Sequence, residues 1–147
     1  MILPVFKNKF AIGTAGLEST DEQMMPISCL ESFSVSFDNG VEEFSPMEEE
    51  GWKRRLLTAK SFSIALNGKR DIGDAGNDYV ADMYFVTGTG ASTKFQWTMI
   101  DGTVVNFNCI VNCTSAGGDS TAIDALEFEV LSDGKPEVIP AATETSE

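Results

Sequence analysis

The sequence predicts a mainly β protein, an antiparallel β-sandwich or open barrel with a single α-helix. Apolar and polar residues alternate with period two in several segments, which is the pattern of strands that bury one face. Turn-forming residues separate these segments, as in DNG at 38–40 and DG at 101–102. Only one stretch, about residues 75–86, has apolar residues at helical spacing. The length of 147 residues suits one domain.

The predicted strands begin at Ile27, where the alternation continues through Phe33, Val35 and Phe37. Residues 58–68 predict a second strand, residues 94–113 a hairpin that turns at 101–102, and residues 122–134 the last strand. Their predicted inward residues include Phe62, Ile64, Leu66, Phe95, Trp97, Met99, Val105, Phe107, Cys109, Val111, Leu126, Phe128 and Val130. Residues 38–57 lack alternation and carry most of the clustered charge, so we expect a long loop or an irregular hairpin there.

The predicted helix follows Asp74, whose carboxylate suits the N-cap position. Asp78 in the first turn suits the positive end of the helix dipole. The apolar stripe that should pack on the sheet consists of Tyr79, Val80, Met83, Tyr84 and Val86.

Both ends of the chain are expected to lie outside the β domain of residues 27–135. Residues 1–26 are rich in Gly, Thr, Ser and Asp and predict an extended N-terminal arm. Residues 136–147 are polar and predict a flexible C-terminal tail. The N-terminus lacks the order of a signal peptide, so we expect synthesis in the cytoplasm. No apolar run approaches the roughly 20 residues of a membrane helix, so no membrane span is predicted.

Three cysteines and no histidine exclude much chemistry. Serine and cysteine nucleophiles usually need a histidine base, and three thiols do not complete the usual four-ligand zinc site. If Cys109 and Cys113 share one strand, they lie roughly 13 Å apart at about 3.3 Å per residue, too far for a disulfide. We therefore predict no cofactor and cysteines that pack as small core residues.

Three other patterns suggest chemical sites but fit structural roles better. GTG at 88–90 follows the helix and lacks the Gly-Lys-Ser/Thr ending of a phosphate loop. Asp71, Asp74 and Asp78 lack the ligand spacing of a calcium loop. Asp124, Glu127 and Glu129 could be imagined as catalytic carboxylates, but their spacing is common to any polar strand face. The sequence predicts no active site, and so no enzyme.

The net charge of −13 argues against tight binding of nucleic acid, because Lys and Arg must replace the counterions of phosphates. It does not exclude DNA that passes close by, since an acidic wall repels phosphate. The one basic cluster, Lys53 to Arg55, stands beside Glu48 to Glu50. We expect it to meet carboxylates, within the chain or on a neighbour, rather than phosphate.

Two segments resemble the major tail tube proteins of long-tailed bacteriophages: TAKSFSIALNGKRDIGDAGNDYVADMYF at 58–85 and GGDSTAIDALEFEVLSDGKPEV at 117–138. The most specific part is GKRDIGDAGNDYVA, in which a strand end leads into one capped helix. The resemblance covers about residues 27–138 and adds little for the N-terminal arm.

The resemblance implies a structural virion protein, made in the bacterial host cytoplasm and located in the tail. In that family, six copies form a ring, rings stack into a tube, and strands of the subunits join into a continuous inner β-barrel. Viral DNA passes through this channel during ejection without specific binding. The implied partners are further copies of the chain and the tape-measure, tail-terminator and baseplate or tail-tip proteins.

Two sets of residues follow as candidates for these contacts. The polar strand faces supply the channel-lining candidates Gln96, Thr98, Asn106, Asn108, Glu127 and Glu129. In the family, the N-terminal arm and the long loop between early strands mediate stacking between rings, and they correspond here to about residues 1–26 and 38–57. The loop supplies the inter-ring contact candidates Glu48, Glu49, Glu50, Trp52, Lys53, Arg54, Arg55, Leu56 and Leu57. Exposed ion pairs contribute only roughly 0–1 kcal/mol each, so the apolar members should supply most of the attachment.

Two alternatives remain open on the sequence. A head–tail adaptor or tail-terminator protein can share this β architecture. A soluble ligand-binding β-sandwich could use Trp52 or Trp97 as a platform for carbohydrate or protein.

Overall fold

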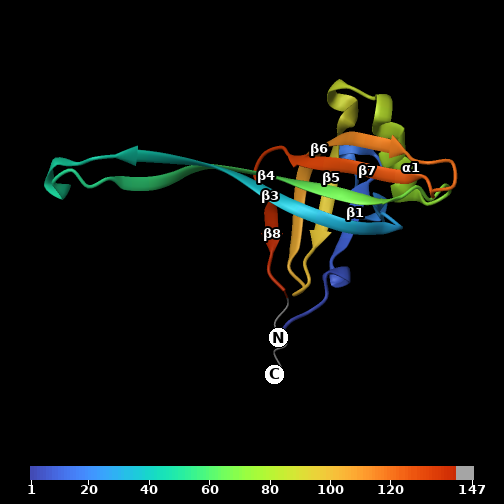
Figure 1. Ribbon diagram of the computed structural model, residues 1–147, viewed down its shortest axis with the longest axis horizontal. Coiled ribbons are helices and arrows are strands. Elements are labelled where there is room, and N and C mark those ends of the chain that lie inside the picture. Colours follow the sequence, from blue (N-terminus) through green and yellow to red (C-terminus); the bar gives the residue numbers. More distant parts are fainter. Residues whose placement is uncertain (142–147) are drawn as a thin grey trace.

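The computed structural model describes residues 1–141 of the chain. Its eight strands form one antiparallel sheet of order β2-β1-β5-β6-β7-β4-β3, with β8 paired to β6 (Figure 1). The strands are β1 (Lys9–Gly13), β2 (Met24–Pro26), β3 (Leu30–Phe44), β4 (Arg54–Lys69), β5 (Ser92–Thr98), β6 (Val104–Gly117), β7 (Ala125–Ser132) and β8 (Glu137–Ile139). The helices are α1 (Ala75–Ala81) and the 3-10 turns η1 (Val5–Lys7), η2 (Gly16–Glu18), η3 (Asp21–Gln23), η4 (Met47–Glu49), η5 (Asp82–Phe85) and η6 (Gly88–Ala91). The sheet does not close, so the predicted fold class is confirmed.

The sheet folds into two layers across the long strand β6. Residues 104–110 of β6 pair with β5, whereas residues 109–117 pair with β7. Aromatic side chains then meet between the layers: Phe62 and Phe107 lie 4.8 Å apart, and Phe10 and Phe33 lie 4.9 Å apart. We name β3, β4, β7 and the end of β6 the arm layer, and β1, β2, β5, β8 and the start of β6 the β5 layer. Figure 1 shows the two layers crossing.

The core lies between the two layers, where the predicted alternation places apolar side chains. Strands with one buried face bury every second residue, and the burial of β6 and β7 follows this period. Fully buried large side chains include Phe95, Phe128, Ile12, Ile64, Leu66, Leu126, Val80 and Val130.

Helix α1 covers one end of the sandwich and begins as predicted. The Asp74 carboxylate accepts a hydrogen bond from the Asn77 amide at 3.0 Å, which is an N-cap. The α-helix ends at Ala81 and continues as the 3-10 turn η5, so it is shorter than the predicted 75–86. Val80 and Met83 of the predicted stripe are buried in the core.

Buried Asn77 ties the helix to the strands. Its Oδ1 accepts hydrogen bonds from Arg70 Nη1 at 2.8 Å and from the Asp71 amide at 2.9 Å. Its Nδ2 donates to the carbonyls of Ser28 at 3.2 Å and Lys69 at 3.0 Å. All four bonds lead to residues outside the helix, to Ser28 after β2 and to the end of β4 and the residues that follow it, so Asn77 fixes the position of the helix on the sheet.

Glycine is required at two positions of the same GKRDIGDAGNDYVA segment. A Cβ at Gly76 would clash with the carbonyl oxygen of Pro26, and a Cβ at Gly68 would clash with that of Cys29. Backbones can approach this closely only where no side chain intervenes. The motif that carries the family resemblance is therefore a packing motif.

The predicted N-terminal arm, residues 1–26, is wrong in part. Strand β1 pairs with both β2 and β5, and its Phe10 and Ile12 lie in the core. The alternation that would have indicated this strand is limited to Phe10 and Ile12, because β1 has only five residues.

The predicted C-terminal tail, 136–147, also needs correction. Residues 137–139 form β8, which pairs with residues 104–106 of β6. A strand this short has too few residues to show alternation. The last six residues of the tail lie outside the described residues.

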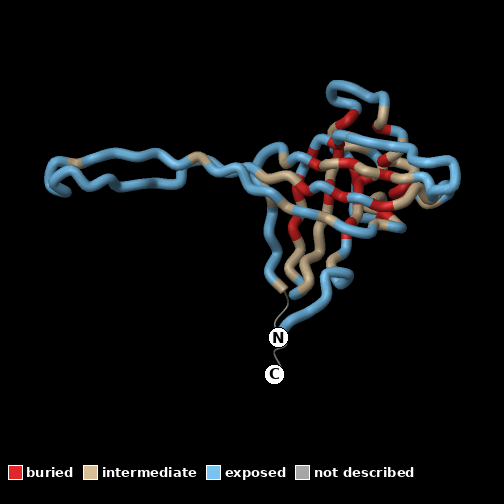
Figure 2. The backbone as a smooth tube through the Cα atoms, in the orientation of Figure 1, coloured by how far each residue is buried: buried red, intermediate tan, exposed pale blue. Residues whose placement is uncertain are grey.

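Of the two forms expected for residues 38–57, a long loop or an irregular hairpin, the structure has the irregular hairpin, which continues the pairing of β3 and β4. The two strands stay paired from Leu30–Gly68 out to Phe44–Arg54, with an irregularity between Gly40 and Val41. We name residues 38–60 the arm, because they project far from the sandwich (Figures 1 and 2). Figure 2 shows the arm exposed along almost its whole length. Alternation is absent here because neither face of the arm is buried.

Candidate assembly surfaces

A tight turn at the tip of the arm presents an exposed tryptophan. The turn consists of η4, then Glu50 at φ 53° and Gly51 at φ 94°, and the Trp52 amide closes it on the Glu49 carbonyl at 3.0 Å. Trp52 is 77% exposed and Met47 is 95% exposed. Large exposed apolar side chains that gather at one place are typical of interaction sites.

The basic residues of the arm already have partners within it. Glu43 accepts from Arg55 Nε at 2.9 Å and from Lys53 Nζ at 3.2 Å, and the Arg54 guanidinium lies 5.7 Å from the centre of the Phe44 ring. The hydrogen bonds from Arg55 and then Lys53 lower the pKa of Glu43. Of the two partners that the sequence left open for the basic cluster, the structure provides the one within the chain.

The acidic block at the tip is left without such partners. Among residues 1–141, no salt bridge involves Glu48, Glu49 or Glu50. Leu56 and Leu57 of the same predicted set are exposed on the arm as well. The structure therefore brings all nine predicted contact residues together on one projecting element, with an acidic and aromatic tip.

The six predicted channel residues do not lie on one surface. Gln96, Thr98 and Asn106 lie on the outer face of the β5 layer, where Gln96 Nε2 donates to Asn106 Oδ1 at 3.0 Å. Glu127 and Glu129 lie on the outer face of the arm layer. Because the apolar faces of the layers pack on each other, their polar faces point in opposite directions. Asn108 pairs with Lys94 of β5, so it belongs to the β5 layer, close to the place where the sheet bends across β6.

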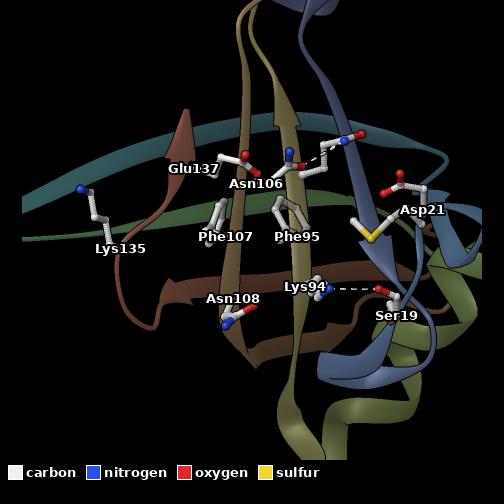
Figure 3. A pocket seen from close by; sticks show the side chains of 11 residues that line it. Ser19, Asp21, Lys94, Phe95, Asn106, Phe107, Asn108, Lys135 and Glu137 are labelled. Atoms are coloured by element: carbon white, nitrogen blue, oxygen red, sulfur yellow. Dashed lines mark hydrogen bonds between the residues drawn. The ribbon is translucent and has the colours of Figure 1, made fainter. Parts of the chain in front are cut away.

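The polar face of the β5 layer contains a hollow of about 320 Å³ that is lined by both basic and acidic side chains. Figure 3 shows Lys94, Asn106 and Asn108 along this hollow, with Lys135 and Asp21 on opposite sides of it. Lys94 Nζ donates to the Ser19 carbonyl at 3.1 Å. Mixed charges of this kind do not make a catalytic constellation.

The polar face of the arm layer contains further residues that were not among the channel candidates. The strand registers place Ser34 and Ala65 beside Glu129, and Ser36 and Ser63 beside Leu131. Serines alternate with apolar residues in both strands, so the signal was visible in SFSVSF and SFSIAL. Small and acidic side chains thus make up much of this face.

The carboxylates that suggested a calcium loop have structural partners. Asp71 accepts from Ser28 Oγ at 2.7 Å, Asp74 caps α1, and Asp78 pairs with Arg70 at 2.7 Å. Within residues 1–141 no cluster of three or more metal-binding side chains is present. No helix in that part of the chain is long and apolar enough to cross a membrane.

Cys109 and Cys113 pack in or against the core as predicted, whereas Cys29 is exposed, so the prediction is wrong for Cys29. Cys109 is fully buried, and burial raises the pKa of its thiol to about 12. Burial also raises the pKa of Cys113 to about 11. Because the thiolate is the nucleophile, neither group is poised to react near neutral pH.

Comparison with known proteins finds likeness in structure but not in sequence. Family models and curated proteins gave no match. A chain from the tail of an empty gene transfer agent particle, refined with helical and C6 symmetry, superposes with a TM-score of 0.77 at 17% identity; the match covers 95% of this chain and all of that one. A chain from the virion of a native gene transfer agent particle gives 0.73 at 18% identity, with the same coverage. The protein therefore has the fold of a chain found in the tail of a gene transfer agent particle.

Proposed function

We propose that this protein is a tail tube subunit of a phage-like particle. In this proposal it forms six-membered rings that stack around a channel through which DNA passes. The observation that carries the proposal is the end-to-end match to a chain of a tail with C6 symmetry. The projecting arm supports it, because a subunit that must bind the next ring needs an element that reaches beyond its own domain.

The outer face of the arm layer is the surface that we assign to the channel. Glu127 and Glu129 lie there beside the serines of β3 and β4. The acidic side chains repel phosphate, and the small neutral side chains carry no charge that would attract it. The other polar face is not acidic in the same way, because Lys94 and Lys135 border its hollow together with Asp21 and Glu137. The assignment keeps Glu127 and Glu129 and moves Gln96, Thr98, Asn106 and Asn108 to the outside of the tube.

The free edge of β3 supports ring formation. Among the described strands β3 pairs only with β4, so its outer edge has unpaired backbone groups along the arm layer. An exposed edge of this length is a template for pairing with another chain. Pairing between subunits would join the arm layers into the continuous inner barrel.

The role that follows is structural and not enzymatic, without a cofactor. The protein would be located in the virion tail after synthesis in the host cytoplasm. Its other partners would be the tape-measure, tail-terminator and baseplate or tail-tip proteins, and DNA would pass without specific binding.

Electron microscopy of the concentrated purified protein tests this proposal. We expect tubes or stacked rings in negative stain, and a reconstruction with sixfold symmetry and Glu127 and Glu129 facing the lumen. Persistent monomers or a single closed ring would favour an adaptor or terminator instead. Stabilisation by a glycan without assembly would favour a ligand-binding sandwich. A tube with Glu127 and Glu129 on its outer wall would overturn the channel assignment alone.

A further inference from the structure

The open end of the sandwich, where the arm begins, contains an apolar cavity of about 240 Å³. We name it the arm-base cavity. Both layers contribute to its apolar lining, which includes Phe37, Phe62, Trp97, Met99, Val105 and Val138. Phe37 is 58% exposed and Val138 is 56% exposed, so the cavity opens to solvent between apolar walls. A concave apolar site with few polar groups is typical of a binding pocket.

One charged residue lines the arm-base cavity, and it is a cation. Lys60 Nζ lies 5.5 Å from the centre of the Phe37 ring, which places its ammonium group against the cavity wall. An occupant that combines an apolar group with negative charge would therefore fit this site best.

The tip of the arm has this combination of properties. Trp52 supplies a large flat apolar side chain, and Glu48, Glu49 and Glu50 supply negative charge that no cation within residues 1–141 neutralises. A tryptophan that enters a pocket, with charges around it, is the composition of an interface hot spot.

The tip cannot reach the cavity of its own chain. The arm is a continuously paired hairpin that holds its tip far from the base (Figures 1 and 2). A second copy must therefore provide the cavity. Because tip and cavity are different surfaces, the contact is head-to-tail, and such contacts propagate into open filaments or rings.

We propose that Trp52 of one copy inserts into the arm-base cavity of a second copy, with Glu48 to Glu50 beside Lys60 of that copy. This inference rests on the proposed function in that it names the receiving site for the arm. It differs from the sequence-based expectation in giving the acidic block, not the basic one, the partner on the neighbour.

A pair of substitutions in β8 tests the cavity. Val138 pairs with Val105 on the core face, whereas Ile139 pairs with Val104 on the outer face. Val138→Arg should fill the cavity and stop assembly, while Ile139→Arg should assemble as the wild type does. Melting temperatures of both monomers check that folding is intact. Normal assembly of folded Val138→Arg would overturn the inference.

A second test uses the tip. Trp52→Ala should raise the concentration needed for assembly by roughly 30-fold, the factor expected for loss of a hot spot, and Trp52→Phe should raise it less. Met47→Ala, also at the tip, is the matched control and should have a small effect. Equal effects of Trp52→Ala and Met47→Ala would contradict specific insertion.

Charge reversal tests the pairing itself. Lys60→Glu alone and the triple change Glu48→Lys, Glu49→Lys, Glu50→Lys should each weaken assembly, and a chain with all four changes should recover it. A merely structural role of Lys60 would give no recovery, and that result would overturn the charge pairing.

The failures of the two proposals are distinguishable. If the wild type forms tubes but Val138→Arg and Trp52→Ala form them equally well, the inference fails and the tube assignment stands. If the wild type forms no tubes, the proposed function fails. Sedimentation then decides the inference: self-association that Trp52→Ala and Val138→Arg both abolish supports it, and the lack of such association overturns it.

Discussion

The two halves of the β3–β4 hairpin have the same backbone pairing but opposite environments. At the root, Ile64 and Leu66 are fully buried between the layers. In the arm, Leu56 and Leu57 of the same strand are exposed. Strand pairing therefore does not depend on a buried face once the root is held in register. The root serves folding, and the arm leaves its apolar side chains available to another molecule.

Truncation of the same residue type in both halves of β4 should give the largest difference in stability. Leu66→Ala removes a fully buried side chain and should lower the free energy of unfolding by about 3–5 kcal/mol. Leu56 is 62% exposed, so Leu56→Ala should change it by less than about 0.5 kcal/mol. Urea unfolding of the dilute monomer measures both. A large loss from Leu56→Ala would mean that the arm belongs to the folding unit.

Asn77 offers the next largest effect, and it concerns polar burial in the sandwich. Asn77→Ala leaves the Asp71 amide and the carbonyls of Ser28 and Lys69 without their partner, at a cost of about 2–3 kcal/mol in the free energy of unfolding. Asn108→Ala is the matched control, because Asn108 is exposed on β6 and should be nearly neutral. Equal losses in urea unfolding would show that Asn77 does not hold the helix in place.

The sequence predicted those parts of the fold where a long strand buries one face. Leu66, Phe107 and Phe128 each belong to a strand of seven or more residues in which apolar residues recur at every second position. All three are in the core. Strand β1 escaped prediction because Phe10 and Ile12 are its only alternating pair. For the arm the sequence left a loop and an irregular hairpin open, because period two disappears where both faces of a strand meet water.

The structure brings the predicted contact residues together but separates the predicted channel residues, and the reason again lies in the difference between local and long-range contacts. The predicted contact residues are adjacent in sequence, so one hairpin kept them together. Gln96 and Glu127 were grouped because both oppose apolar faces, but alternation does not tell which side of a sandwich a strand belongs to. The fold of the sheet across β6 makes that distinction, and it arises from long-range contacts such as Phe62 with Phe107. The arm-base cavity is likewise formed by residues from 37 to 138 and has no local signal.

The smallest effect is expected from two carboxylates whose pKa values are lowered, one in each region. Asp78 in the sandwich is shifted by Arg70 and then by the Gly73 amide, and Glu43 in the arm by Arg55 and then Lys53. A lowered pKa means that the unfolded chain binds protons more readily than the folded one. Each contribution to stability is therefore complete above the ordinary pKa, 3.8 for Asp78 and 4.5 for Glu43, and is lost as the pH falls from there through the folded-state pKa.

The two carboxylates should nevertheless act on different processes. Asp78→Asn should flatten the acid side of the curve of unfolding free energy against pH, because the Arg70 pair holds α1 on the sandwich. Glu43→Gln should leave that curve unchanged, because opening the arm does not unfold the sandwich. It should instead speed amide exchange at Arg54 to Leu57, measured above pH 4.5, where the wild-type pair is intact. If Glu43→Gln flattened the unfolding curve as much as Asp78→Asn does, arm and sandwich would be one cooperative unit, and the arm would contribute to folding as well as to contacts with another copy.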